Sequence, residues 1–528
     1  MNCGELKNLI EGGWPERARC RFDAARRVNE VTCERATLVD LCRRLFHEWD
    51  FSFAGLIVEE GADDWRLRYV FYGERDAGWV QVIVGAPLAE NVFPSIVVEA
   101  RIYAADWHER EAEDLFGVRF EGHPRLGDFV LHDDAWQEGV APMRRGFDAE
   151  AAMRDRRPEA DWRPRRVVHE PGAFVMPIGP KFSGVTESVH FLLETVGEDV
   201  IRSATRLFYK WRAVEKLAEG KTAEEVLLLA ERFAATTAFA HGLAFCQALE
   251  AIAGADVPAR ARALRVFLAE LERLRQHAGA VQEICESTAL VVATSQAGIL
   301  EEELLRASGK LTGHRYLFGL LAPGGLLCDL ATGACREALG EAKAVLSRML
   351  ELESQLRISS SFLDRIEEVG VIFPRTARAY SLVGPVARAS GLARDLRRAQ
   401  PYSGYESFEF DVPLEEEGDG YARLRVLFAE ARQSVRIMEQ AVAALTEGET
   451  RAPINLRAGA ALGAVEAPRG AAFHWVGLDD GGRVSRYRIV TPSFANWHSF
   501  HLAAEKFAFQ DFPIILSTFD LSVAENDR

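Results

Sequence analysis

A charged motif at residues 109–124 is the strongest local signal in the first third of the chain. It reads Glu-Arg-Glu-x-x-Asp-x-x-Gly-x-x-Phe-x-Gly-His-Pro and contains Glu109, Arg110, Glu111, Asp114, Gly117, His123 and Pro124. The spacing predicts a charged helical turn that ends at Gly117, because glycine is favoured just after the last turn of a helix. A rigid Gly-His-Pro turn follows. Such a segment could present charge to a neighbouring surface, and nothing in it requires catalysis.

Cysteines are the other residues that could carry metal or redox chemistry. The chain has eight, and no two of them form a Cys-x-x-Cys pair: Cys3, Cys20, Cys33, Cys42, Cys246, Cys285, Cys328 and Cys335. Zinc ribbons, ferredoxin-type clusters and thioredoxin-type sites all depend on such pairs. We therefore expect reduced, mostly buried thiols and no metal ligands among them.

Length and charge limit the classes of function. At 528 residues the chain is long for one core, so two or three domains are expected. A formal net charge of -16 argues against nucleic acid or an anionic membrane surface as the main partner. The longest uncharged apolar stretch, residues 316–328, is interrupted by Pro323-Gly324-Gly325 and is too short to span a bilayer. Membrane association would therefore go through partner subunits.

The elements that position these residues fall into two modules. In the first, an amphipathic helix is predicted at residues 37–50, and strands at 56–60, 65–72, 79–85 and 95–103. Residues 149–172 are rich in arginine and proline and read as a linker, for which a solvated tether is favoured over a partner-binding segment. The rest is mainly helical, with helices expected at 223–253, after Pro258, at 336–356 and at 421–446. Short strands are expected at 173–176 and 486–491.

These patterns predict an α+β protein. A small N-terminal α/β domain covers residues 1–148, the linker covers 149–172, and a mainly α-helical domain with minor flanking strands covers 173–528. The N-terminal motif, together with Pro142-Met143-Arg144-Arg145-Gly146-Phe147, resembles the signature of the peripheral, C-type subunit of complex I.

The second module resembles two related proteins, the quinone-site, D-type subunit of complex I and the large subunit of formate-hydrogenlyase-type energy-converting hydrogenases. The matching motifs lie in order at residues 179–180, 187–191, 206–216, 270–277, 311–316, 384–391, 395–397, 401–405, 418–423 and 520–528. The resemblance implies a hydrogenase-large-subunit-like helical fold.

Departures from the hydrogenase pattern decide what chemistry the resemblance implies. Nickel–iron hydrogenases hold their metals with two Cys-x-x-Cys pairs, since soft thiolates suit nickel and iron. In register, those four positions fall on Ala234, Thr237, Ser522 and Glu525, so the resemblance implies a vacated metal site. In complex I the equivalent space belongs to the quinone cavity. Its usual headgroup residues are missing too, because the loop 181–186 has no histidine and Ala235 stands at the tyrosine position.

Two residues said to lie near the terminal iron–sulfur cluster of complex I are retained by resemblance, Arg232 and His277. A cation or hydrogen-bond donor beside a cluster stabilises its reduced form. From the residues alone, the favoured interpretation is that Arg232 is a helix-surface arginine and His277 a satisfied core histidine. The resemblance favours an iron–sulfur interface.

The resemblance as a whole implies a subunit of a membrane-bound, ion-translocating oxidoreductase complex without its own nickel–iron centre. It would dock a small iron–sulfur subunit, which carries the cluster, and sit on antiporter-like and anchor membrane subunits at the cytoplasmic face. The chain would bind no cofactor itself, with quinone left open. Two alternatives remain: a complex I-type NADH:quinone oxidoreductase C/D subunit with a quinone-binding cavity, and a non-catalytic structural subunit that couples its neighbours.

Overall fold

The N-terminal part of the protein is built on a five-stranded sheet. The computed structural model describes residues 2–73, 77–137, 139–169, 171–180 and 187–528. The sheet has the order β1-β2-β5-β4-β3, with β2 and β5 parallel and the other neighbours antiparallel. Its strands are β1 (Ala18–Asp23), β2 (Val28–Cys33), β3 (Ser52–Glu60), β4 (Asp64–Tyr72) and β5 (Trp79–Pro87). The strands predicted at 56–60, 65–72 and 79–85 are confirmed.

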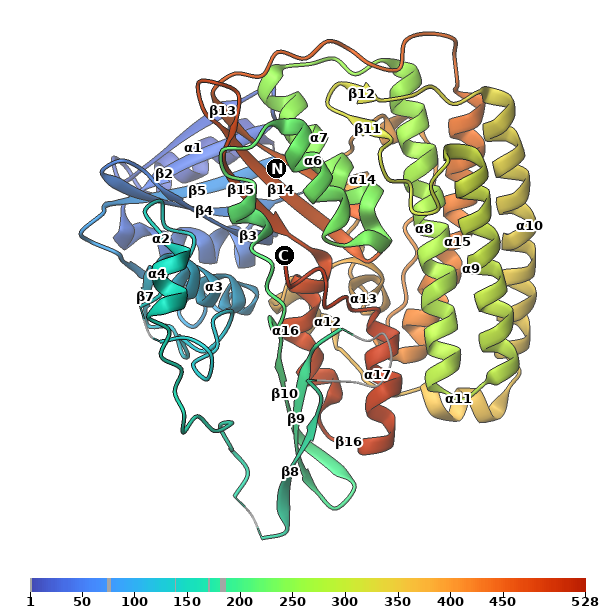
Figure 1. Ribbon diagram of the computed structural model, residues 1–528, viewed down its shortest axis with the longest axis horizontal. Coiled ribbons are helices and arrows are strands. Elements are labelled where there is room, and N and C mark those ends of the chain that lie inside the picture. Colours follow the sequence, from blue (N-terminus) through green and yellow to red (C-terminus); the bar gives the residue numbers. More distant parts are fainter. Residues whose placement is uncertain (1, 74–76, 138, 170, 181–186) are drawn as a thin grey trace.

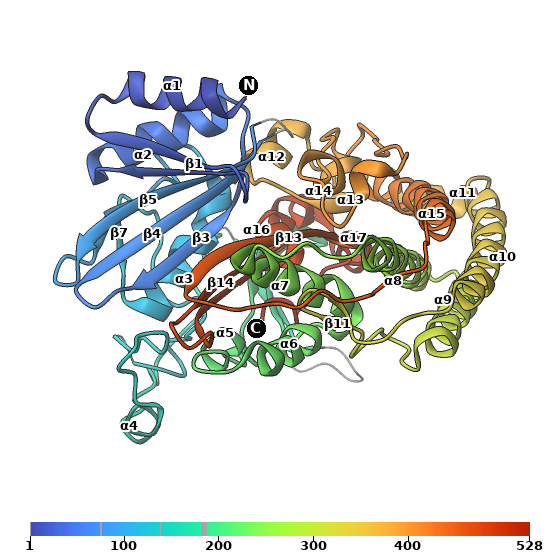
Figure 2. The same cartoon turned by 90° about the horizontal axis from the view of Figure 1, so that it is seen from above.

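Two helices cover one face of this sheet (Figure 2). They are α1 (Cys3–Gly13) and α2 (Arg35–Arg43), which continues as a π-helical turn through Glu48. Leu38, Leu41 and Leu45 are fully buried, as the predicted amphipathic face requires. The charged motif forms α3 (Asp106–Phe116), which ends at Gly117 with a left-handed φ of 71°. The predicted glycine stop is therefore confirmed.

Four long helices lie side by side on the opposite side of the molecule (Figure 1). They are α8 (Ala259–Ser287), α9 (Val291–Thr312), α10 (Thr332–Leu356) and α15 (Gly420–Ala443). The helices expected after Pro258, at 336–356 and at 421–446 are confirmed. With the N-terminal sheet, this bundle confirms the predicted α+β class.

Two further sheets join the parts. The antiparallel strands β13 (Gly459–Ala467), β14 (Gly470–Leu478) and β15 (Val484–Val490) lie between the N-terminal sheet and the bundle (Figures 1 and 2). A protruding sheet has the order β16-β10-β9-β8, with β8 (Ala173–Ile178), β9 (His190–Val196), β10 (Asp199–Arg206) and β16 (Phe507–Ala508). Two helices, α16 (Pro492–Ala504) and α17 (Phe512–Phe519), lead to the C-terminus at the centre of the molecule (Figure 1).

Two sequence predictions are wrong. Residues 95–103 do not form a strand; β6 (Val92–Pro94) is followed by bends, and Arg101 has a left-handed φ of 54°. The helix expected at 223–253 is broken into α6 (Ala223–Arg232) and α7 (Ala238–Ala253) by a 3₁₀ turn. At this break, arginines take backbone carbonyls that a continuous helix would use: Arg212 bonds the Phe233 oxygen at 2.9 Å, and Arg275 bonds the Thr236 oxygen.

The two modules share an apolar core. One large cluster combines residues of the N-terminal sheet with residues of β9, β10, α16 and α17. Trp107 of α3, for example, packs against Phe494 of α16 with ring centroids 5.7 Å apart. A second large cluster fills the bundle and the β13–β15 sheet. Within the described residues, no helix combines the length and apolarity needed to cross a bilayer.

Candidate functional site

The four positions assigned to a vacated metal site lie together. Ala234 precedes the 3₁₀ turn between α6 and α7 and Thr237 is its last residue, while Ser522 and Glu525 lie in the segment after α17. The Thr237 hydroxyl donates to a carboxylate oxygen of Glu525 at 3.1 Å. The Ser522 hydroxyl accepts from the Glu525 amide at 3.2 Å. The fold therefore joins two segments that are almost the whole second module apart in sequence.

These positions offer oxygen and hydrocarbon groups where a nickel–iron site needs thiolates. Among the described residues, no group of three or more His, Cys, Asp or Glu is placed to hold a metal ion. Six of the eight cysteines are buried, as expected. Burial raises the pKa of the Cys20 thiol to about 11, so that this sulfur is not a thiolate at neutral pH.

A row of buried polar side chains ends beside Glu525, and its first three members are joined by hydrogen bonds. The Tyr487 hydroxyl lies 2.7 Å from His474 Nδ1, and His474 Nε2 lies 3.0 Å from His241 Nδ1. The second nitrogen of His241 lies 3.8 Å from the Glu525 carboxylate. All four side chains are fully buried. They come from β14, β15, α7 and the C-terminal segment, so no local sequence pattern brings them together.

The tautomers of this row follow from one of its ends. The Tyr487 hydroxyl can donate or accept, so the Glu525 end decides the direction. An anionic carboxylate favours a proton on His241 Nε2, which leaves His241 Nδ1 to accept from His474 Nε2 and His474 Nδ1 to accept from Tyr487. Each donor in the row thus faces the carboxylate. Burial lowers the pKa of His474 well below its ordinary value, which keeps this ring neutral.

Glu525 is held as an anion. Its second carboxylate oxygen accepts from the Ser493 amide at 3.1 Å, in the first turn of α16, where the helix dipole favours negative charge. Arg469 lies 3.6 Å away and also pairs with Asp520 at 3.0 Å. Burial opposes ionisation, but His241 and Arg469 outweigh it and lower the pKa of Glu525 to about 2. The arrangement therefore fixes one negative charge in the buried site.

Arg232 and His277 lie in different surroundings. Arg232 is in the last turn of α6, and its side chain is 46% exposed. It pairs with Glu231 at 3.1 Å and stacks over Phe318 at 5.1 Å. His277 is fully buried in α8 and hydrogen-bonds Glu430 at 2.9 Å. Arg232 can therefore touch a partner, whereas His277 could act on a partner's cluster only through the protein between them.

His277 borders a buried ion network. Four carboxylates and three guanidinium groups, all nearly inaccessible, make up this network: Glu270, Asp395, Glu430, Glu466, Arg273, Arg388 and Arg397. Arg388 is central, with Nε 2.6 Å from Glu430 and Nη1 2.8 Å from Glu466. One negative charge is in excess when His277 is neutral. Burial raises the pKa of Glu466, whereas the neighbouring guanidinium groups lower the pKa of the other three carboxyls.

The charged motif of α3 serves the contact between the two modules. Glu111 accepts from Arg488 at 2.5 Å and from Arg528 at 3.0 Å, and all three residues are buried. The neighbouring surface expected from the sequence is therefore the second module of the same chain. The other members hold their own loop. Asp114 accepts from three consecutive amides of residues 129–131, and His123 lies 3.2 Å from Asp106, beside the exposed Pro124.

Comparison with known proteins agrees with this architecture. The family described as the 30 Kd subunit of respiratory-chain NADH dehydrogenase matches residues 31–152, and the 49 Kd subunit family matches residues 293–456 and 450–528. Formate hydrogenlyase subunit 5 of Escherichia coli is 31% identical over 460 residues, which cover 85% of this chain and 79% of that protein. The chain belongs to the family of these subunits.

The C/D subunits of NADH-quinone oxidoreductase are further members of this family. That of Bdellovibrio bacteriovorus is 29% identical over 447 residues, covering 82% of this chain and 78% of that protein. That of Acinetobacter baylyi is 28% identical over 529 residues, covering 91% and 85%. These matches confirm the resemblance to both a fused C/D subunit and a formate-hydrogenlyase-type subunit.

The sequence analysis did not identify three of the residues around Glu525, namely His474, Tyr487 and Arg469. His474 lies on β14, for which no strand was predicted, and Tyr487 lies on β15, which the predicted strand at 486–491 largely matches. The alternation of Tyr487 with its neighbours could have marked it as inward-facing once the strand was known.

Glu109 of the family motif should make stability depend on pH. Its carboxylate accepts from Ser95 and from the Ile96 amide, and burial raises its pKa from 4.5 to about 8. The folded protein therefore favours the protonated form of Glu109. The contribution of this group to the free energy of unfolding is complete below pH 4.5 and is lost as the pH rises through 8. Glu109→Gln should remove up to about 1.4 kcal/mol per pH unit from the slope of stability in that window. Urea unfolding of both proteins between pH 5 and 9 measures the difference, and parallel curves would refute it.

Proposed function

We propose that the chain is the fused peripheral subunit of a membrane-bound, ion-translocating oxidoreductase complex and has no nickel–iron centre of its own. The relatives named as C/D subunits of NADH-quinone oxidoreductase and as formate hydrogenlyase subunit 5 support the oxidoreductase assignment. The observation that carries the proposal is the meeting of Ala234, Thr237, Ser522 and Glu525 at one place, where all but Ser522 are buried. Those side chains have no thiolate to offer a metal.

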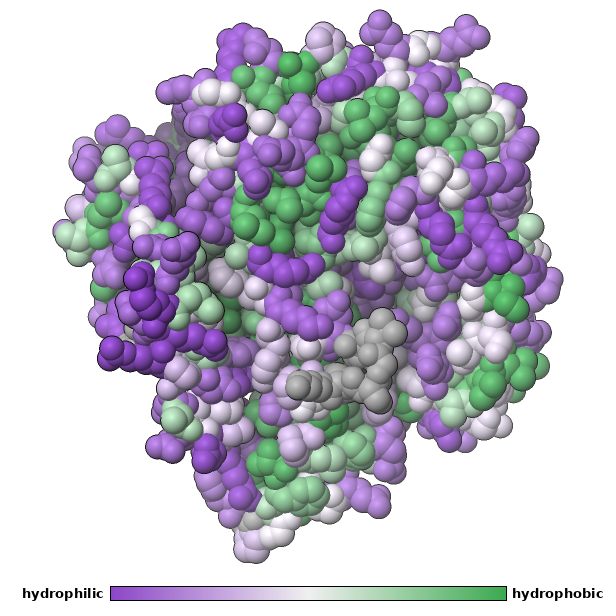
Figure 3. All heavy atoms as spheres, viewed as in Figure 1, coloured by the Kyte–Doolittle hydropathy of each residue, from purple (hydrophilic) through white to green (hydrophobic). Residues whose placement is uncertain are grey.

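In this function the chain docks a small iron–sulfur subunit. The exposed guanidinium of Arg232 and the half-exposed Leu228 on the same helix support a docking face there. The protruding β8–β10 sheet offers a second candidate, since it exposes Phe174, Val196 and Ile201, and apolar side chains gather on it (Figure 3). Contacts to antiporter-like and anchor subunits would hold the chain at the cytoplasmic face of the membrane.

The buried row beside the site holds the charge of Glu525 in place. His241 directs its Nε2 hydrogen toward the carboxylate, and hydrogen bonds from His474 and from Tyr487 fix the orientation of the two rings. Burial raises the pKa of the Tyr487 hydroxyl well above its ordinary value, so Tyr487 stays protonated and supplies no proton to Glu525. The role of the row is therefore to fix one negative charge beside the partner's electron transfer.

Affinity purification tests the assignment. The full chain, tagged and expressed in its native cells, is recovered from detergent-solubilised membranes, and the co-purified subunits are identified by mass spectrometry. We expect a small iron–sulfur subunit together with antiporter-like membrane subunits. Recovery of a lone monomer from the soluble fraction would contradict the proposal.

The alternatives are separated by activity. A complex I-type C/D subunit would support inhibitor-sensitive quinone reduction by the intact complex. Ala235 has only a methyl group at the position of the usual tyrosine, and loop 181–186, which lacks the usual histidine, lies outside the described residues. We therefore expect weak turnover with ubiquinone or menaquinone analogues. A purely structural subunit would leave ion translocation unaffected by Glu525→Gln.

Arg232→Ala should lower the midpoint potential of a cluster in the partner subunit by tens of millivolts. A unit charge a few ångströms away contributes at most a few kcal/mol at an effective dielectric near 20, and roughly 59 mV corresponds to one decade for a one-electron couple. His277→Ala should shift the potential less, since His277 is buried and bonded to Glu430. Redox titration followed by electron paramagnetic resonance decides, with Arg336→Ala on α10 as the control. If neither substitution changes the midpoint potential of any cluster, the assignment of Arg232 and His277 to the iron–sulfur interface is wrong.

A further inference from the structure

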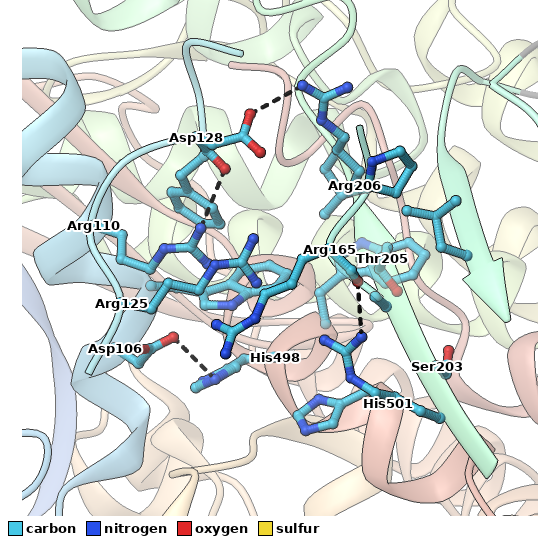
Figure 4. Close-up of a pocket in the computed structure, with 18 of the residues that line it drawn as sticks. Asp106, Arg110, Arg125, Asp128, Arg165, Ser203, Thr205, Arg206, His498 and His501 are labelled. Atoms are coloured by element: carbon cyan, nitrogen blue, oxygen red, sulfur yellow. Dashed lines mark hydrogen bonds and ion pairs between the residues drawn. The ribbon is translucent and has the colours of Figure 1, made fainter. Parts of the chain in front are cut away.

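A basic cavity lies where α3, the linker, β10 and α16 meet (Figure 4). Its volume is about 510 Å³, in the range of small-molecule sites. Six arginines line it, against three acidic residues. These arginines are Arg110, Arg125, Arg163, Arg165, Arg202 and Arg206. Such a concentration of positive charge stands out in a chain with a net charge of -16.

Two of the six arginines are paired with carboxylates of the described residues, and four are not. Arg202 pairs with Glu194 at 2.6 Å, and Arg206 pairs with Asp134 at 2.6 Å and with Asp128 at 3.0 Å. In the described part of the chain, the other four arginines make no ion pair with a carboxylate: Arg110, Arg125, Arg163 and Arg165. Figure 4 shows the side chains of Arg110, Arg125 and Arg165 gathered on one side of the cavity.

The buried members of the cluster are already fixed in position. Arg110 donates to the carbonyls of Gly127 and Asp128 at 3.2 Å and stacks over Phe129 at 4.3 Å. It is only 7% exposed, and its Nε has no hydrogen-bond partner. Arg206 stacks over Trp162 of the linker at 4.0 Å. A ligand would therefore contact two arginines that are already held in place, Arg110 and Arg206, and the exposed guanidinium groups of Arg125, Arg163 and Arg165.

We propose that this cavity binds a phosphate group. Guanidinium forks match phosphate oxygens in pairs, and a phosphate dianion or diphosphate compensates several clustered charges where one carboxylate compensates a single one. The aromatic faces of Phe129 and Trp162 are occupied by arginines, so recognition rests on the anion and not on a stacked ring. The phosphate could belong to a soluble phosphate ester or to a lipid headgroup of the membrane that carries the complex.

Calorimetry on the full-length chain tests the proposal with inorganic pyrophosphate, ADP, and vesicles with or without phosphatidic acid. The double variant Arg125→Gln/Arg163→Gln removes two exposed charges that have no carboxylate partner. The matched control, Arg336→Gln/Arg357→Gln, removes two exposed charges at α10. We expect saturable binding that the first variant weakens at least tenfold and the control leaves unchanged. Binding of pyrophosphate and ADP identifies a soluble source, and binding of phosphatidic acid vesicles alone identifies a lipid.

A second measurement needs no variant. Phenylglyoxal modifies exposed arginines, and the bound phosphate probe should protect Arg125, Arg163 and Arg165 but not Arg336, as read by mass spectrometry of peptides. The proposal is overturned if wild type and double variant bind every probe equally, or if no probe binds. It is also overturned if cross-linking within the intact complex shows an acidic segment of another subunit seated in the cavity.

Discussion

Arg388→Met should destabilise the protein by about 3–5 kcal/mol, because it leaves buried carboxylates without their main counter-charge. Arg388 bonds Glu430 at 2.6 Å and Glu466 at 2.8 Å, and none of the three side chains is more than 2% exposed. Methionine fills a similar volume, so the loss of charge and not a cavity dominates. The measurement is the midpoint of urea unfolding followed by circular dichroism.

The exposed Arg336→Met on α10 is the matched control and should stay within about 0.5 kcal/mol of wild type. Adding Glu430→Gln to Arg388→Met removes one of the buried carboxylates left without a counter-charge. The double variant should therefore recover part of the lost free energy of unfolding. An unfolding midpoint for Arg388→Met that matches the control would show that solvent or rearrangement compensates the network.

Glu111→Gln should weaken the contact between the two modules and lower the stability of the protein. Among the described residues, Glu215 is then the one side-chain carboxylate still paired with Arg488 and Arg528, at 3.3 and 3.4 Å. Removing one partner of a buried ion pair typically costs about 3–5 kcal/mol. We expect a lower melting temperature and faster proteolytic cleavage in the linker at 149–172.

The exposed Glu99, for which no ion pair is described, provides the control, since Glu99→Gln removes the same charge from the same module. It should leave both the melting temperature and the linker cleavage unchanged. If Glu111→Gln behaves like Glu99→Gln, the shared apolar core and not the ion cluster holds the modules together.

Local patterns predicted much of the fold because many elements are locally consistent. The strands β3, β4 and β5 and the helices α8, α10 and α15 follow alternation and helical periodicity. The failures have tertiary causes. Ile96, Ala100 and Ile102 are buried although their backbone bends, partly because the Ile96 amide bonds Glu109. The same apolar alternation thus arises without a strand.

The site was less accessible to sequence reasoning. Register with a known family located Ala234, Thr237, Ser522 and Glu525, but it could not show what fills the space between them. The row from Tyr487 through His474 to His241 depends on strands and helices that meet only in the folded chain. The linker is a similar case. Its composition favoured a solvated tether, but one of its residues, Trp162, stacks with Arg206 of β10.

The central claim is that this chain serves a redox complex without a nickel–iron centre of its own. Nickel, iron and acid-labile sulfide, measured on the affinity-purified complex and normalised to this chain, test it directly. We predict no nickel, and iron that is fully matched by the sulfide of clusters in partner subunits. One nickel per chain would contradict the account.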